Sequence, residues 1–222
     1  MRINKFVASA SGLSRRGADE AIAQGRVMVD GQPAAMGQEV TESQHVTLDG
    51  TPIHAPNEVK TIIFNKPTGY VVSRNGQGSK TIYDLLPPAL HNLNPVGRLD
   101  KDSSGLLLLT NDGELANTLT HPRFAKVKIY EVALDKPLEP LHHQMISDFG
   151  VQLEDGKSRL GLERVDNSGF RWKITMQEGR NRQIRRTFSA VGYTVTRLQR
   201  TQFGEHSLQN LQSGEWKLTT NA

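Results

Sequence analysis

Two short segments near the amino terminus carry apolar residues at helical spacing, and turn residues punctuate the stretch that follows. These apolar residues are Ile3, Phe6, Val7 and Ala10 in the first segment, and Ala18, Ala21 and Ile22 in the second. Ser14 precedes the second segment and is a typical helix N-cap. After Gly25, residues 26–30 alternate like a strand up to an Asp30-Gly31 turn, and Asp49-Gly50 marks a second turn. The pattern predicts two short helices followed by a small β-meander.

The segment His54–Glu58 is polar and contains Pro56, which is typical of a linker. We therefore expect a small α/β domain over residues 1–56 and a larger domain over residues 60–222. A small domain followed by a medium one suits a chain of this length.

The larger domain alternates between strand and helix patterns. Strand patterns cover residues 61–65, 105–110, 127–134, 170–176 and 193–198, and helical spacing covers residues 81–86, 112–119, 138–149 and 181–191. Asp112 is placed to cap the second of these helices. This interleaving predicts an α+β fold built on a mixed, mainly antiparallel sheet with flanking helices.

The composition restricts the chemistry. Of 222 residues, 36% are hydrophobic and none is cysteine. The chain can therefore bury ordinary cores, while disulfides, thiol nucleophiles and cysteine-bound metals are excluded. No apolar run approaches the ~18 residues that span a bilayer. We expect a cytoplasmic protein that does not contact a membrane.

The net charge of +4 conceals a strongly basic segment. Residues 170–200 carry eight Lys and Arg but one acidic residue, Glu178, which gives +7, while the rest of the chain is close to neutral. Seven of the eight are Arg, whose planar fork suits phosphate and stacks on bases. A solvated helix face is the ordinary interpretation, and a nucleic-acid partner is the functional one.

Asp100 and Asp102 lie just before the apolar run of residues 105–109. A carboxylate there emerges at the edge of a rigid sheet, which suits a catalytic group because the sheet holds it in register with a substrate. For Asp102, followed by Ser103-Ser104, an ordinary Asx turn is the alternative. The pattern alone does not choose between the two carboxylates.

Residues 178–186 form a glycine-hinged turn that leads into a helix, on which Arg182, Arg185 and Arg186 share a face. The segment resembles a phosphate-binding helix start, although it lacks the Gly-Lys-Ser/Thr ending of a P-loop.

Strand alternation places Lys128 and Tyr130 on one face, so Tyr130 is either a core residue or an aromatic platform for a base.

Adjacent histidines do not readily chelate one ion on a helix, because their side chains diverge by about 100°. His142 and His143 are such a pair, and we expect no metal site.

Four motifs, in order along the chain, resemble the bacterial ribosomal-RNA pseudouridine synthases of the small-subunit/large-subunit uridine family. They are Asn65-Lys66-Pro67-Thr68-Gly69; Gly97-Arg98-Leu99-Asp100 with residues 105–113; Lys128-Ile129-Tyr130-Glu131-Val132; and Glu178-Gly179-Arg180-Asn181-Arg182-Gln183-Ile184-Arg185-Arg186. The resemblance covers nearly the whole chain. Residues 2–48 resemble a small RNA-binding domain that a small-subunit ribosomal protein shares with these enzymes.

The resemblance assigns a role to each candidate residue. Asp100 corresponds to the catalytic aspartate, Tyr130 to the active-site tyrosine, and Arg185 to the basic residue that pairs with the aspartate. Arg98 and Leu198 are then expected in the substrate pocket. The expected RNA-binding residues are Arg2, Lys5, Ser14, Arg15 and Arg16 in the first domain, and Lys128, Arg180, Arg182 and Arg186 in the second.

The implied reaction breaks the N1–C1′ bond of a uridine within RNA, rotates the freed uracil and rejoins it through C5. This is an isomerisation that needs neither cofactor nor metal, and the implied partner is ribosomal RNA or a ribosome-assembly intermediate. We expect a monomer. Asp100 acts as a nucleophile or promotes glycal formation, and the sequence leaves both routes open.

The target uridine is less defined than the reaction. The stretch Gly150–Gly156 favours a large-subunit target, although the small-subunit enzyme shares this architecture. The alternative function is a noncatalytic RNA-binding or ribosome-assembly module that retains the fold.

Overall fold

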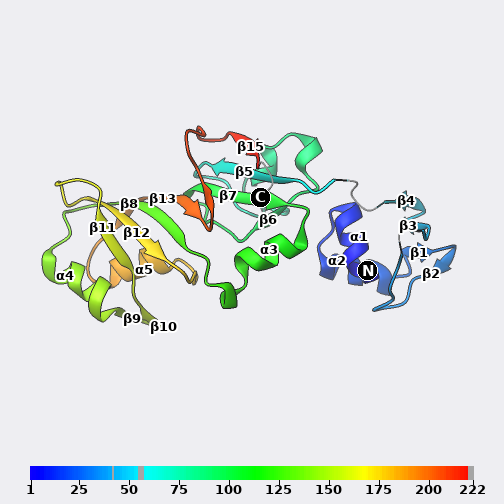
Figure 1. The fold of residues 1–222 in the computed structure, drawn as a ribbon, viewed down its shortest axis with the longest axis horizontal. Helices are drawn as coiled ribbons and strands as arrows, with labels where there is room; N and C mark the ends of the chain where they lie inside the picture. The colour runs from blue at the N-terminus through cyan, green and yellow to red at the C-terminus, as the bar shows by residue number, and fades with distance from the viewer. Residues whose placement is uncertain (42, 55–57, 220–222) are drawn as a thin grey trace. The chain divides into compact units, whose positions relative to one another are not determined.

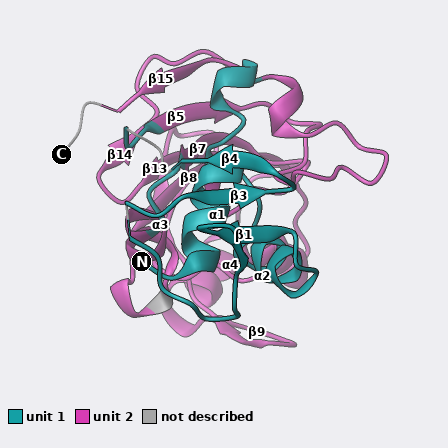
Figure 2. Cartoon of the chain, turned by 90° about the vertical axis from the view of Figure 1, so that its right-hand side faces the viewer, with its two compact units in different colours: residues 1–61, 86–94, 110–113 teal, residues 62–85, 95–109, 114–222 magenta. Residues whose placement is uncertain are grey.

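The computed structural model describes residues 1–41, 43–54 and 58–219, and the chain divides into two compact units (Figure 2). The first comprises Met1–Thr61, Leu86–Asn94 and Thr110–Gly113, and the second comprises Ile62–Leu85, Pro95–Leu109 and Glu114–Ala222. The first unit thus includes two short segments from beyond the predicted boundary. The predicted linker over residues 54–58 includes residues 55–57, which lie outside the described residues.

Two helices precede a small antiparallel sheet in the first unit, as the sequence predicts (Figure 1). The elements are α1 (Ile3–Ser11), α2 (Arg15–Ala23), β1 (Val27–Val29), β2 (Gln32–Pro33), β3 (Val46–Leu48) and β4 (Thr51–Ile53), with strand order β2-β1-β3-β4. The apolar faces of both helices pack with Val27 and Val46 in one core. Ser14 caps α2, because its hydroxyl accepts a hydrogen bond from the backbone N–H of Gly17 at 3.0 Å.

A long mixed sheet forms the centre of the second unit. In the described residues its order is β11 (Gly161–Arg164), β12 (Arg171–Met176), β8 (Lys128–Leu134), β13 (Val195–Phe203), β7 (Ser104–Thr110), β5 (Thr61–Lys66) and β15 (Trp216–Leu218). β6 (Asn94–Val96) pairs with β7, and β14 (His206–Ser207) pairs with β13. β13 runs parallel to β7 and antiparallel to β8. The predicted α+β class with a mixed, mainly antiparallel sheet is confirmed.

The remaining helices are short. They are the 3₁₀ helices η1 (Ile82–Asp84), η2 (Pro88–Leu90) and η3 (Pro122–Phe124), the α-helices α3 (Gly113–Thr120), α4 (Pro140–Gln144) and α5 (Gln183–Ala190), and the π-helical turn η4 (Met145–Phe149). Of these helices, η2 lies in the first unit, α3 begins in the first unit at Gly113, and the others belong to the second unit. The helix predicted over residues 138–149 is therefore α4 followed by a π turn.

The sheet is anchored by strands that are buried on both faces. β5 is buried along its whole length, and so are residues 105–110 of β7. Leu119 of α3 packs with Leu106, Leu108 and Phe203 in one cluster. β7 is paired with β13 on one side and β5 on the other, so the loop that precedes β7 is attached to a rigid part of the sheet.

Candidate active site

Asp100 lies in the loop between β6 and β7, and a buried lysine from β5 fixes this loop. The Nζ of Lys66 donates hydrogen bonds to the carbonyl oxygens of Pro67 (2.9 Å), Asp100 (3.1 Å) and Ser103 (2.8 Å). Burial lowers the pKa of Lys66 to about 8, and the negative charge of Asp100 partly opposes this shift. Sequence reasoning placed Lys66 in a motif without a role. Its signal was a lysine two residues after the apolar run Ile62–Phe64, within the same strand pattern.

Asp102 binds two arginines from the segment that begins α5. Arg182 contacts both carboxylate oxygens of Asp102, from Nη1 at 3.0 Å and from Nη2 at 2.8 Å. Arg185 places Nε 3.3 Å from Oδ2 of Asp102 and donates from Nη2 to its backbone carbonyl at 2.8 Å. The hydrogen bonds from Arg182 lower the pKa of the Asp102 carboxyl below its usual value. Asp102 is therefore more than an ordinary turn residue.

The ion pair expected between Arg185 and Asp100 does not match the contacts in the structure. Arg185 forms its ion pair with Asp102, and Arg182 is the arginine near Asp100, with Nη1 3.8 Å from Oδ2. Arg185 also donates to the carbonyl of Val195 at 2.8 Å, and burial lowers the pKa of its guanidinium. The physical reason is a turn of the backbone at residues 101–102, directly after Asp100. This turn directs the Asp102 side chain toward the start of α5, where it meets both arginines.

Arg182 occupies an unusual backbone conformation. It is the N-cap of α5 with φ of 45°, in the left-handed region that non-glycine residues rarely adopt. Its pKa is raised by the hydrogen bond to Asp102. Strained backbone of this kind clusters at functional sites, where the surrounding structure maintains it.

A cavity of about 260 Å³ is lined by this loop, by the segment that begins α5, and by strands β8 and β13 of the sheet. Register pairs Tyr130 of β8 with Arg200 of β13, and Leu198 lies two residues before Arg200 on the same strand. Tyr130 and Leu198 are both buried and line the cavity. Strand pairing thus brings together residues that are far apart in sequence.

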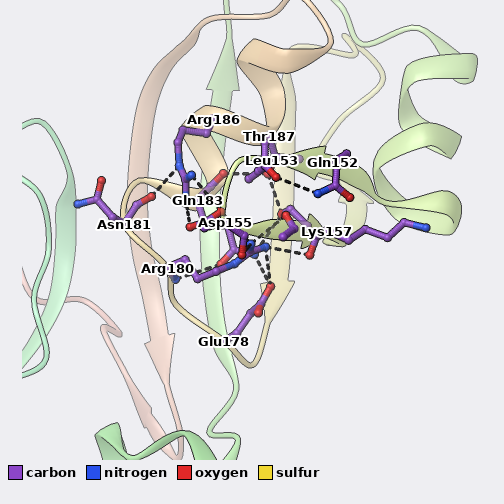
Figure 3. A network of polar contacts seen from close by, with 12 residues as sticks. Gln152, Leu153, Asp155, Lys157, Glu178, Arg180, Asn181, Gln183, Arg186 and Thr187 are labelled. Atoms are coloured by element: carbon purple, nitrogen blue, oxygen red, sulfur yellow. Dashed lines mark hydrogen bonds and ion pairs between the residues drawn. The ribbon is translucent and has the colours of Figure 1, made fainter.

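A polar network binds α5 and the segment before it to the hairpin of β9 (Val151–Leu153) and β10 (Gly156–Ser158) (Figure 3). Arg186 contacts both carboxylate oxygens of Asp155, at 3.0 and 2.6 Å. Arg180 donates to Asp155 Oδ1 at 2.9 Å and to the carbonyls of residues 155–157. Within the helix, Gln183 donates to Ser158 Oγ at 3.0 Å. Arg180 and Arg186 thus hold the hairpin against α5.

The predicted site residues fall into three groups. Arg98, Asp100, Lys128, Tyr130, Arg180, Arg182 and Leu198 line the cavity. Arg185 lies beside it against Asp102, while Arg186 is bound to Asp155. Arg2, Lys5, Ser14, Arg15 and Arg16 belong to the first unit. Sequence reasoning missed Lys66, Asp102 as the arginine partner, and the cavity residues Arg200 and Phe203.

Neither a metal cluster nor a membrane-spanning helix is found in the part of the chain that the structure describes. No group of three or more His, Asp or Glu side chains there could hold a metal ion. None of the helices described is long and apolar enough to cross a membrane.

Comparison with known proteins identifies the family of this fold and cavity. Residues 60–190 match the RNA pseudouridylate synthase family, and residues 1–46 match the S4 domain. The chain therefore belongs to the RNA pseudouridylate synthase family, and it is a pseudouridine synthase.

The similarity extends over the whole chain. A ribosomal large subunit pseudouridine synthase B of Bacillus subtilis (strain 168) is 36% identical, covering 96% of this chain and 90% of that protein. A ribosomal small subunit pseudouridine synthase A of Yersinia pestis is also 36% identical, covering 99% and 95%. A crystal structure of a pseudouridylate synthase superposes with a TM-score of 0.71 at 30% identity, covering 99% of this chain and 96% of that one.

Proposed function

We propose that this enzyme converts a specific uridine of ribosomal RNA to pseudouridine and that Asp100 is its catalytic aspartate. The observation that carries the proposal is the placement of the Asp100 carboxylate in one cavity with Tyr130 and Leu198, beside the arginine pair on Asp102. Relatives named for both ribosomal subunits support ribosomal RNA as the substrate class.

Asp100 has to be ionised to act on the sugar or the base. Arg182 places Nη1 of its guanidinium 3.8 Å from Oδ2 of Asp100, so an opposite charge faces the carboxylate in the proposed reaction. Lys66 holds the backbone carbonyl of Asp100, so the loop does not have to be ordered when RNA binds. The same placement serves a nucleophilic attack on C1′ and proton abstraction that leads to a glycal.

Tyr130 is the group proposed to contact the uracil ring. It is buried in the cavity wall, where its ring offers a stacking face and its hydroxyl a base for the C5 proton. Leu198 supplies an apolar surface for the same ring. A cavity of about 260 Å³ admits a base but not a duplex, so the target nucleotide is flipped out of its stack.

The first unit supplies a second RNA contact in this proposal. Arg15 and Arg16 are exposed in the first turn of α2, and their segment lies within the S4 match. Arg2, Lys5 and Ser14 belong to the same proposed surface, although the Ser14 hydroxyl also caps α2. We favour a large-subunit uridine, and a monomeric enzyme in the cytoplasm.

Two measurements test the function and its target. Ribosomal RNA labelled with tritium at uridine C5 loses the label when C5 forms the new glycosidic bond, so wild-type enzyme should release tritium. A wild-type protein that releases none from either subunit's RNA contradicts the proposal. Mapping pseudouridines in cells with and without the gene should show one missing position, which we expect in the large subunit.

A further inference from the structure

Arg200 is a buried cation that lines the cavity. The sequence motifs assign it no role, and the proposed mechanism has not required it so far. It is 3% exposed and lies on β13 directly across from Tyr130 of β8. It lines the same cavity as Asp100. Residues paired across neighbouring strands project on the same side of the sheet, so Arg200 and Tyr130 face the same cavity.

The contacts of Arg200 leave part of its guanidinium unused. Nε donates to the carbonyl of Leu106 at 2.8 Å, and Cζ lies 4.7 Å from the centroid of the Phe203 ring. Nη2 is buried and has no hydrogen-bond partner among the described residues. Among the described residues, Arg200 forms no ion pair: its guanidinium nitrogens have no carboxylate oxygen within 4.0 Å.

A second cation lies beside it. The Nζ of Lys128 is 5.4 Å from the centroid of the same Phe203 ring and donates to the carbonyl of Gln177 at 3.1 Å. Burial lowers the pKa of Lys128, the charge of Arg200 lowers it further, and Glu178 opposes the shift. Glu178 itself is bound by Arg180 and Gln183. Among the described residues, neither Lys128 nor Arg200 forms an ion pair with a carboxylate, so this part of the cavity carries positive charge that is not neutralised by a direct contact.

An unpaired buried cation is unfavourable unless a ligand supplies negative charge. We propose that Arg200 is a catalytic residue that stabilises the negative charge on uracil when the C1′–N1 bond breaks. This inference rests on the proposed function.

The electron pair of the broken bond stays on the uracil, where it spreads over N1, O2 and O4. In the nucleophilic route the Asp100 carboxylate bonds to C1′, and this bond breaks again when C5 attacks C1′. In the glycal route the sugar loses a proton from C2′, and the proton returns to C2′ when C5 adds to C1′. C5 then bonds to C1′, the C5 proton leaves, and N1 gains a proton. Arg200 stays protonated throughout, and the product is an isomer of the substrate.

The backbone around Arg200 is held rigidly, which suits electrostatic stabilisation because little reorganisation is then needed during the reaction. Arg200 pairs with Gly105 of the parallel strand β7. A Cβ atom on Gly105 would lie 2.6 Å from the backbone nitrogen of Arg200, so the close approach requires glycine. A phosphate would instead meet the exposed arginines Arg98 and Arg182.

The test compares two leaving groups in single-turnover reactions. An RNA fragment spanning the mapped site is synthesised with uridine or 5-fluorouridine at the target and a radiocarbon label in that base. Fluorine stabilises the departing uracil anion, so it reduces the need for Arg200. Nuclease digestion and chromatography then follow the loss of the starting nucleoside.

For Arg200→Gln, the rate on uridine should fall about 100-fold, as when one donor is removed from an oxyanion site, and the rate on 5-fluorouridine about tenfold. The Kd for RNA should stay within about threefold of wild type. Arg197→Gln is the matched control, because Arg197 is exposed on the same strand and bound to Gln199. It should behave as wild type on both substrates.

Arg200→Lys keeps the charge but loses the forked geometry, and it decides the test if Arg200→Gln gives no cooperative melting curve. It should be slower on uridine than on 5-fluorouridine, each relative to wild type. Equal slowing on both substrates, wild-type rates, or weaker RNA binding at an unchanged rate overturns the inference, the last outcome indicating a phosphate contact. Failure of wild-type tritium release instead overturns the proposed function.

Discussion

Asp102 controls where two arginines lie relative to Asp100. Its carboxylate binds Arg182 through both oxygens, and it also contacts Arg185 through its side chain and its backbone. Without that charge, Arg182 would lose its main partner and its position 3.8 Å from Asp100. Asp102 therefore acts as a positioning residue for the proposed chemistry.

Asp102→Asn should lower the single-turnover rate about 10- to 100-fold, because small displacements of positioning groups have effects of this size. RNA affinity should not fall, since the change removes a negative charge. Asp166→Asn is the control, because Asp166 is also held by an arginine, Arg171, but lies outside the cavity. Equal rates for the two variants would refute the role of Asp102.

Lys66 gives a stability prediction with a defined direction in pH. Its pKa is about 8 in the folded protein against an ordinary value of 10.5. Between these values the unfolded chain holds a proton that the folded chain lacks, so the free energy of unfolding rises with pH. Below pH 8 both states are charged, and the cost of burial is constant.

The free energy of unfolding of wild type, measured relative to Lys66→Met, should therefore rise by roughly 3 kcal/mol from pH 8 to 10.5. The variant cancels the titration of other groups common to both proteins. Denaturant unfolding at several pH values gives the difference. A difference that stays flat over this range contradicts a depressed pKa for Lys66.

At the scale of elements, β13 shows where pattern-based prediction ends. The sequence predicts a strand over residues 193–198, but β13 continues to Phe203. A register shift between Arg200 and Gln202 breaks the alternation of buried and exposed positions, so a period of two no longer marks the strand. The unpredicted part carries Arg200 and Phe203, two of the cavity residues that sequence reasoning missed.

Strands and helices with strong patterns were predicted well. β5, β7 and α5 lie where their apolar residues indicate, because burial on one or both faces leaves a clear signal. Short strands such as β9, β10 and β15 were missed, since three residues give too little periodicity. The polar network of Asp155 was also missed, because its members meet only in the folded chain.

The contact between β7 and β13 should be sensitive to one methyl group. Gly105→Ala would place Cβ 2.6 Å from the Arg200 nitrogen at φ of 105°, and the strands would have to separate. Gly192→Ala also introduces a side chain at positive φ, but no atom lies within 4 Å of its Cβ. Thermal melting should show a much larger drop in Tm for Gly105→Ala. Equal drops would contradict the close approach.

At the scale of the whole molecule, the +7 of residues 170–200 overstates the free positive charge. In the structure, six of these eight basic residues contact an acidic group: Arg171, Lys173, Arg180, Arg182, Arg185 and Arg186. The partners include Asp102 and Asp155, which lie outside the segment. A charge count along the sequence cannot show this neutralisation, because it depends on contacts made in the fold.

The first unit should contribute to RNA affinity rather than to the chemical step. Arg15→Ala and Arg16→Ala should each weaken RNA binding and reduce the slope of log K against log salt concentration by about 1. The single-turnover rate at saturating RNA should be unchanged. Arg26→Ala is the control, because Arg26 is already paired with Asp49 in the same unit. Unchanged salt slopes would place the RNA contact elsewhere.

Asp100 performs the chemistry in the proposed mechanism. The most direct test of this role is tritium release from C5-labelled ribosomal RNA by Asp100→Asn, with RNA affinity measured on the same preparation. The substitution keeps the size of the side chain and removes the carboxylate. We predict RNA binding close to that of wild type and no detectable release. Release at the wild-type rate would contradict the account and would favour a function in RNA binding or ribosome assembly that does not use Asp100.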